Sequence, residues 1–151
     1  MTDRQVKEVR VTLKQIRCSK VGSDAGPTLE IYGNLRALGV FVNGQGQFEA
    51  GFTGKLWDRA DNNAVQMAET NQLFPNTQTT FIVFENDFLW VGGRLFEDDD
   101  LDADDDMGAR DARILYRDIA TKDVPVRFQE SSQIVDVTFG IELLRTFALS
   151  T

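Results

Sequence analysis

No histidine occurs in the 151-residue chain, and cysteine occurs once, at Cys18. Histidine is the commonest general base and the usual transition-metal ligand, so its absence argues against zinc and copper centres and against Ser-His-Asp catalysis. A single cysteine cannot form an internal disulfide. Because no histidine is present to activate its thiol, we expect Cys18 to be a small buried residue or a loop-end thiol and not a nucleophile.

Long apolar runs and basic clusters are also missing. No run approaches the ~20 apolar residues that cross a bilayer, and residues 1–8 contain no apolar stretch of the kind found in signal peptides. Lys and Arg number 16 against 24 Asp and Glu, and the absence of a basic stripe argues against nucleic-acid binding. The length and the 42% hydrophobic content favour one globular domain over residues 1–151.

One strongly acidic segment, residues 97–108, is the most distinctive feature that the chain does have. Eight of its first ten residues are Asp or Glu, and none of the twelve is basic. The rest of the chain carries 16 acidic and 16 basic residues, so the net charge of −8 belongs to this segment. Neighbouring carboxylates repel by about 1 kcal/mol per close pair even in water. The segment must therefore be fully solvated or neutralised by a cation.

Two interpretations of the acidic segment follow from its position. A block of like charges is often only a solvated or disordered loop. Here, however, strand-like runs at residues 88–96 and 112–116 flank the segment and would hold it in place. Calcium takes about six to eight oxygen ligands and accepts clustered carboxylates, whereas magnesium keeps more of its water. The sequence therefore favours a calcium site.

Alternation of apolar and polar residues predicts strands along most of the chain, with one slip in the alternation near Gln15. Residues 65–69 fit a short strand or one helical turn equally well. Asn86-Asp87 predicts a tight turn that joins residues 79–85 and 88–96 as a hairpin. No stretch shows a sustained helical period, so we expect an antiparallel β-sandwich or barrel of about eight strands. The predicted strands cover residues 6–17, 28–38, 40–42, 47–57, 79–85, 88–96, 112–119, 124–129 and 134–149.

The acidic segment resembles a calcium loop of C2 domains, in which Asp-x-Asp is followed after five residues by Asp-x-hydrophobic-Gly. Here Glu97-x-Asp99 is followed, after five residues, by Asp105-Asp106-Met107-Gly108. A second calcium loop of that family typically reads Gly-x-Ser-Asp-Pro-Tyr, and Gly22-Ser23-Asp24 followed by Ala25-Gly26-Pro27 is similar to it. Cys18 stands where the family has an earlier Asp, so this loop departs from the family pattern.

The resemblance implies a single C2-like β-sandwich whose loops at one end, residues 18–30 and 97–106, bind Ca²⁺. Glu30 is a weaker candidate ligand. An EF-hand-like loop is a rival geometry, since Asp100, Asp102, Asp104, Asp106 and Asp111 match its positions 1, 3, 5, 7 and 12, but Asp105 stands where that loop needs glycine. The ligands expected for the C2-like site are Asp24, Glu97, Asp98, Asp99, Asp100, Asp104, Asp105 and Asp106.

The partners that the resemblance implies are calcium together with anionic membrane lipid or another protein. In C2-like domains the bound ion commonly bridges to lipid headgroups, but only Leu101 and Met107 are apolar near this site. Calcium could instead stiffen a structural, adhesion or toxin module that forms part of a larger secreted or assembly protein of bacteria. The use of calcium favours an extracellular or cell-surface setting.

An enzyme is the competing class, for example a hydrolase that uses two of the carboxylates. Such a reaction needs two acids in different environments, one of them with a raised pKa. A run of adjacent exposed Asp residues offers no such difference. The sequence therefore favours a binding module without catalytic activity.

Overall fold

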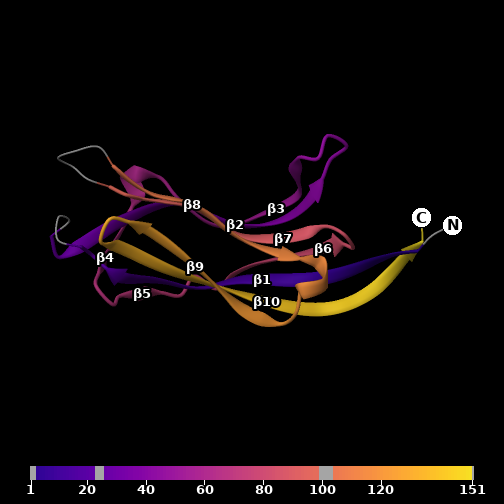
Figure 1. Cartoon of the computed structure of the whole chain (residues 1–151). Helices are drawn as coiled ribbons and strands as arrows, with labels where there is room; N and C mark the ends of the chain where they lie inside the picture. Colours follow the sequence, from indigo (N-terminus) through magenta and orange to yellow (C-terminus); the bar gives the residue numbers. More distant parts are fainter. Residues whose placement is uncertain (1–2, 23–25, 99–103, 151) are drawn as a thin grey trace.

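The computed structural model describes residues 3–22, 26–98 and 104–150, which fold into two antiparallel β-sheets packed face to face (Figure 1). The only helical elements in these ranges are the 3-10 turns η1 (Asp61–Asn63) and η2 (Tyr116–Asp118). None of the described helical segments is long and apolar enough to cross a membrane. The strands are β1 (Asp3–Lys20), β2 (Thr28–Val42), β3 (Phe48–Arg59), β4 (Val65–Ala68), β5 (Gln72–Leu73), β6 (Thr77–Phe84), β7 (Phe88–Glu97), β8 (Asp105–Leu115), β9 (Lys122–Glu130) and β10 (Gln133–Ser150).

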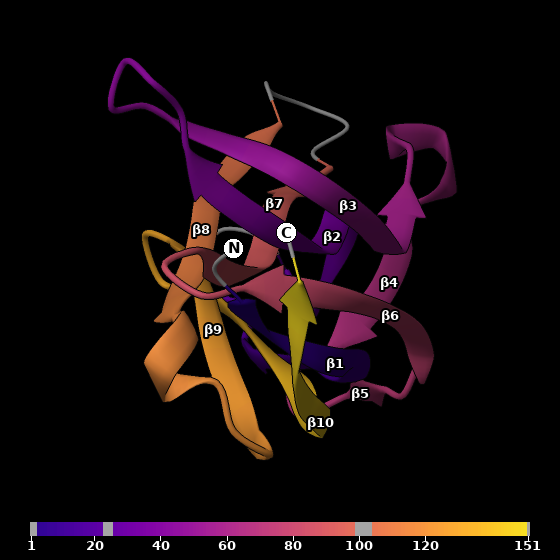
Figure 2. The same ribbon diagram turned by 90° about the vertical axis from the view of Figure 1, so that its right-hand side faces the viewer.

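Each sheet is built around two long central strands. In sheet A, β10 lies between β1 and β9, while β6 and the short β5 share the other edge of β1. In sheet B, β7 lies between β2 and β8, while β3 and the short β4 share the other edge of β2. Figure 2 shows β2, β3 and β7 in one layer and β1, β9 and β10 in the other. Eight long strands and two short ones confirm the antiparallel β-sandwich of about eight strands expected from the sequence.

Strand β1 illustrates how alternation builds the core between the sheets. Val11 and Leu13 point inward, and Ile16 and Cys18 continue the buried row after a register shift just before Gln15, where the sequence alternation slips. All four side chains are fully buried. Removing each such aliphatic side chain from water stabilises the fold by about 1.5–3 kcal/mol. The buried position of Cys18 agrees with its expected role as a small core residue.

The hairpin expected between residues 79–85 and 88–96 does not form. The chain does turn tightly at Asn86, which has a φ of 73°, and Asp87 N donates to Phe84 O at 3.0 Å. However, β6 pairs with β1 in sheet A, whereas β7 pairs with β2 and β8 in sheet B, so the turn carries the chain from one sheet to the other. Both strands alternate in the same way because both bury one face in the shared core, and alternation alone does not reveal which sheet a strand joins.

Two strand boundaries also differ from expectation. Residues 40–42 do not form a separate strand, because β2 continues through Gly39 with only a register shift before Val40. The strand expected at 112–119 begins earlier, at Asp105, and ends at Leu115, where η2 follows. The last residues of the acidic segment are therefore part of β8. Residues 65–69, for which the sequence left strand and helical turn open, contain β4.

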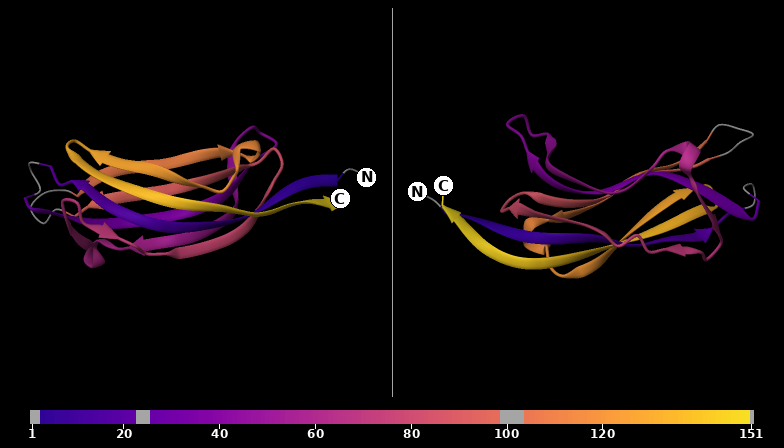
Figure 3. Two further views of the ribbon diagram at one scale, coloured as in Figure 1. Left: turned by 90° about the horizontal axis from the view of Figure 1, so that it is seen from below. Right: turned by 180° about the vertical axis from the view of Figure 1, so that it is seen from behind.

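The two ends of the sandwich differ in shape. At one end, the β2–β3 hairpin projects from sheet B, and β1 and β10 run out side by side beyond the other strands (Figures 1 and 3). This ribbon is regular, with Asp3 opposite Ser150 and Gln5 opposite Ala148. The end of β7 and the start of β8, which flank the acidic segment, lie at the opposite end (Figure 1).

Candidate metal site

The acidic segment joins β7 to its neighbour β8 and lies close to the start of β2. Glu97, the last residue of β7, is opposite Ile31 of β2 on one side and opposite Asp105 of β8 on the other. Asp98 N then donates a hydrogen bond to Glu30 O at 2.8 Å. The base of the 18–30 loop and the base of the acidic loop therefore meet at one end of the sandwich.

Five of the eight predicted ligands lie in the described residues: Glu97, Asp98, Asp104, Asp105 and Asp106. The other three, Asp24, Asp99 and Asp100, lie outside the described residues, as does Asp102 of the EF-hand-like alternative. The strands and their neighbours set the direction and the contacts of these five side chains.

Glu97 and Asp105 face each other across the β7–β8 ladder, on the inner side of sheet B. Their inward direction follows from the neighbours, since Leu95 and Met107, two residues away on the same face, are fully buried. Glu97 itself is only 5% exposed. Side chains directly opposite in an antiparallel pair have Cβ atoms about 4.5–5.5 Å apart, and like charges there are destabilising. A cation bound beside this pair would remove the repulsion.

Asp104 is held by Tyr32, which lies on the outer face of β2. The Tyr32 hydroxyl donates to Asp104 Oδ2 at 2.5 Å, and the ring stacks on Phe96 with centroids 5.1 Å apart. Burial raises the pKa of Tyr32 well above its ordinary value, and the hydrogen bond to Asp104 and the charges of Asp104, Asp61 and Asp98 raise it further. Three carboxylates therefore act on one phenol at this end of sheet B.

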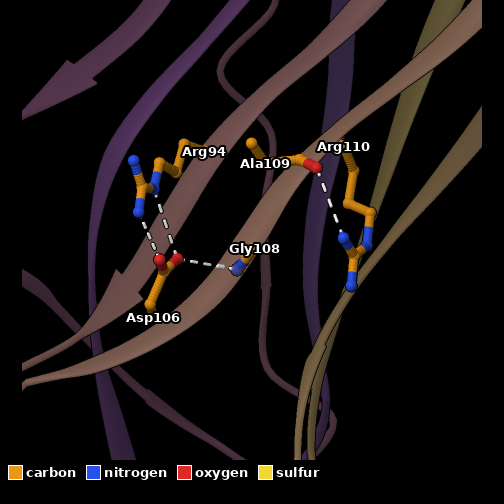
Figure 4. A network of polar contacts seen from close by, with 5 residues as sticks. All are labelled: Arg94, Asp106, Gly108, Ala109 and Arg110. Atoms are coloured by element: carbon orange, nitrogen blue, oxygen red, sulfur yellow. Dashed lines mark hydrogen bonds and ion pairs between the residues drawn. The ribbon is translucent and has the colours of Figure 1, made fainter.

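Asp106 also faces outward and is paired with Arg94 of β7 (Figure 4). Arg94 Nε donates to Asp106 Oδ1 at 3.3 Å, its Nη2 donates to Oδ2, and Gly108 N donates to Oδ1 at 2.9 Å. These hydrogen bonds, from Arg94 first, lower the pKa of Asp106. The guanidinium also lies over the Phe96 ring, 5.0 Å from its centroid. Asp106 is thus neutralised locally and points away from the Glu97–Asp105 pair.

The predicted ligands that the structure describes therefore do not form one cluster. Among the described residues, no three Asp, Glu or Cys side chains come together closely enough to hold a metal ion. The inner pair Glu97 and Asp105 fits a divalent cation best, because both carboxylates share one face at a loop base. The chemistry of the donors, oxygen only, suits calcium or magnesium better than softer metals.

The EF-hand-like alternative conflicts with the strand geometry. Asp106 and Asp111, its positions 7 and 12, both lie in β8, where successive residues pair with β7, and in the described residues only the short 3-10 turn η2 follows, not an α-helix. Asp111 accepts a hydrogen bond from Arg36 at 2.5 Å across β7. An extended strand cannot wrap around an ion as that loop does.

Sequence reasoning missed three residues that lie at this site: Tyr32, Arg94 and Asp61. The alternation of their strands places Tyr32, two residues after Glu30, and Arg94, two residues before Phe96, on the outward face. Their contacts with the acidic segment depend on the pairing of β2 with β7, which the alternation of either strand does not specify. Asp61 belongs to η1 and carries no sequence signal of its own.

Comparisons with known proteins by sequence find no match, either among family models or among curated proteins. Solved structures with a similar arrangement include human GIVD cytosolic phospholipase A2 with an inhibitor and terbium chloride, at 14% identity, a TM-score of 0.47, and coverage of 99% of this chain and 20% of that chain. A C2 domain of plant extended synaptotagmin 1 is similar at 7% identity and a TM-score of 0.41, covering 92% of this chain and 96% of that one. The chain thus spans about a fifth of the phospholipase. Similarities of this strength assign no function.

Proposed function

We propose that this chain is a non-enzymatic, C2-like calcium-binding module in which the acidic loop 97–106 and the loop 18–30 hold the ion. One observation carries the proposal: Glu97 and Asp105 are directly opposite each other on the inner face of sheet B, at the base of a loop with six further Asp or Glu residues in positions 97–106. Calcium is the hard cation that most readily accepts such a ligand set. Asp24, Asp99 and Asp100 are proposed to complete the shell.

The module is proposed to use bound calcium to associate with a membrane or with a protein partner. Insertion of apolar loop residues into lipid is not favoured at Met107, because this side chain is completely buried under sheet B. Calcium bridging to anionic headgroups would first have to neutralise the negative charge of this end. A protein partner, or a structural role in which calcium stiffens the loops, needs no such neutralisation by lipid.

Calorimetry with calcium, with magnesium and with chelator tests the proposal. A ligand at about 100 times its Kd stabilises the folded state by about 2.7 kcal/mol, which raises the Tm of a domain of this size by roughly 5–10 °C. We expect this rise in calcium and a smaller one in magnesium. Identical melting curves in millimolar calcium and in chelator would remove the proposal.

Variants of the loop residues test which carboxylates bind calcium, and vesicles test whether the partner is a lipid membrane. Asp99→Asn together with Asp105→Asn should abolish the calcium-dependent rise in Tm, whereas Asp102→Asn should leave most of it. Equal losses would favour a site centred on the loop tip. Co-sedimentation with phosphatidylserine vesicles, with and without calcium, then distinguishes lipid association from a protein partner or a structural role.

A further inference from the structure

An apolar groove of about 740 Å³ lies at the end of the sandwich opposite to the acidic loop. Its walls are the β2–β3 hairpin on one side and the last residues of β6 on the other. Phe41 in the hairpin wall is 36% exposed, whereas Phe81 in the opposite wall is only 7% exposed. Exposed apolar surface that gathers in a groove marks a binding site more often than scattered single residues do. The apolar residues that line it include Phe41, Val42, Phe52, Phe81, Ile82 and Phe84.

The groove exists because the edges of the two sheets separate at this end. Further along, β3 and β6 touch: Thr77 Oγ1 donates to Leu56 O at 2.5 Å, and a Cβ at Gly54 would lie 2.5 Å from Thr79 Oγ1. Beyond this point the hairpin bends away, after a register shift before Val40. The stacked rings of Phe52 and Phe81, 4.4 Å apart, join the diverging walls. These rings close the core, so the groove lies between the diverging edges of the two sheets, outside the buried interior.

Both walls of the groove are open strand edges. In the described part of the chain, β6 pairs only with β1 and β3 pairs only with β2. Glu85 N donates to Gln5 O at 2.9 Å, which fixes the alternation of the β1–β6 ladder. By that alternation Thr80 and Ile82 direct their N–H and C=O groups away from β1 and towards the groove. A partner in extended conformation could form backbone hydrogen bonds with these groups while its apolar side chains contact the groove.

The charges that line the groove lie at one end only. Arg4 and Asp87 are 3.6 Å apart there, and the Arg4 guanidinium lies over the Phe84 ring, 4.4 Å from its centroid. The Arg4 side chain is 44% exposed, so it remains accessible to a second anion. The remaining lining is uncharged. Charge complementarity thus calls for a ligand that is uncharged along most of its length and carries an acidic group near Arg4.

We propose that the groove binds an extended peptide segment of a protein partner, which adds to sheet A as a strand beside β6. Alternate apolar side chains of the segment fill the groove, its backbone pairs with Thr80 and Ile82, and an acidic residue at one end reaches Arg4. Strand addition of this kind obtains affinity from backbone hydrogen bonds and specificity from pockets for alternate side chains. This surface is separate from the acidic loop, so its peptide partner does not depend on calcium.

Synthetic peptides test this proposal directly. The probe is a set of acetylated seven-residue peptides that alternate Thr with Val, Ile, Leu or Phe and carry one Asp at either end. We expect at least one member to bind with sub-millimolar Kd, in calcium and in chelator alike, and to slow hydrogen exchange at the Thr80 and Ile82 amides. N-methylation of alternate backbone amides of that peptide should weaken binding at least tenfold. If no member binds below 1 mM, or if the methylated peptide binds equally well, the proposal is overturned.

Two variants provide a matched comparison. Phe41→Asp places a charge in the groove wall and should weaken peptide binding at least tenfold. Phe74→Asp changes a side chain that is 61% exposed outside the groove and should leave binding unchanged. Equal effects of the two variants would contradict the proposal. Binding of dodecyl maltoside below its micellar concentration with the same exchange protection, or self-association that Phe41→Asp abolishes, would overturn it in favour of an amphiphile or a second copy of the chain.

Discussion

At the scale of single residues, Tyr32 reports the electrostatic state of the acidic end. Its hydroxyl donates to Asp104, and the carboxylates of Asp61 and Asp98 add negative potential around it. Ionisation of this phenol would place another negative charge among them. Burial and, after it, these neighbouring carboxylates raise the pKa of Tyr32, and burial is also the main cause of the raised pKa of the second tyrosine, Tyr116. Each shift favours the neutral phenol in the folded state.

We predict that the tyrosines of the folded protein do not ionise at about pH 10, where a free tyrosine is half ionised. The raised pKa means that the unfolded chain loses its tyrosine protons first, so stability is retained below that pH and falls as the pH rises above it. Absorbance at 295 nm against pH measures the titration. In a Tyr116→Phe variant, calcium should lower the pKa of Tyr32, because the ion offsets the neighbouring carboxylates; a calcium-independent titration would contradict the placement of the site.

At the scale of strands, β7 needs a glycine at the position where side chains of the two neighbouring strands form an ion pair across it. Arg36 of β2 and Asp111 of β8 are both opposite Gly92, and their ion pair spans it. A Cβ at Gly92 would lie 1.9 Å from Arg110 O and 2.8 Å from Asp111 Oδ1. Real Cβ atoms do not approach a backbone oxygen so closely, so any side chain here must push two strands apart.

Gly92→Ala is therefore expected to lower the free energy of unfolding by about 2–4 kcal/mol, the scale of overpacking and backbone strain. Gly44→Ala is the matched control, since a Cβ there meets nothing within 4 Å. It should have little effect or stabilise slightly by restricting the unfolded chain. Urea unfolding of both variants decides, and equal midpoints would refute the strand contact at Gly92.

Removing one of the opposed carboxylates of β7 and β8 should change the stability of the protein in opposite directions without and with calcium. Without calcium, Asp105→Asn should stabilise the protein by about 0.2–1 kcal/mol, because it removes a like charge directly across from Glu97. With calcium, the same change should make the protein less stable than the wild type, because a ligand is lost. Thermal melts of the variant and the wild type in chelator and in calcium provide the four values. Destabilisation in both conditions would show that the pair does not repel.

Alternation along single strands predicted much of this structure. The slip near Gln15 in the sequence is a register shift in β1, and the strand at residues 79–85 is found as β6. The pairing of β6 and β7 was not predictable in this way, because apolar alternation marks a buried face and not a partner. The same limit applies to the site: the excess of Asp located the loop, but only the register shows that Glu97 points inward while Asp106 points outward to Arg94.

At the scale of the whole molecule, charge is distributed very unevenly. The excess of eight negative charges belongs to residues 97–106 of the sequence, which join β7 to β8, while the outer face of sheet A carries cross-strand ion pairs such as Arg10–Glu142 and Lys14–Asp123. Repulsion within the acidic end is long-ranged when salt is low, because the screening length is about 30 Å at 0.01 M and about 8 Å at 0.15 M. Salt should therefore change the stability of the protein mainly by screening the repulsion within this acidic segment.

We expect the Tm in chelator to increase as sodium chloride is raised from about 0.01 to 0.15 M, because screening weakens the repulsion among the carboxylates. The increase should be smaller in saturating calcium, which has already neutralised them. Melting curves in a salt series, with and without calcium, measure the difference. A Tm that falls with salt in chelator would mean that the paired charges on sheet A matter more than the acidic loop.

The β1–β10 ribbon determines how the molecule can be tethered. Asp3 and Ser150 are paired at the tip of this ribbon, at the opposite end from the β7–β8 connection. A tag or linker attached at either terminus therefore leaves the end of the sandwich where β7 ends and β8 begins unobstructed. Immobilised through such a tag on a sensor chip, the protein would present its acidic end to vesicles in the flow, while the peptide groove would lie close to the chip and be tested better in free solution.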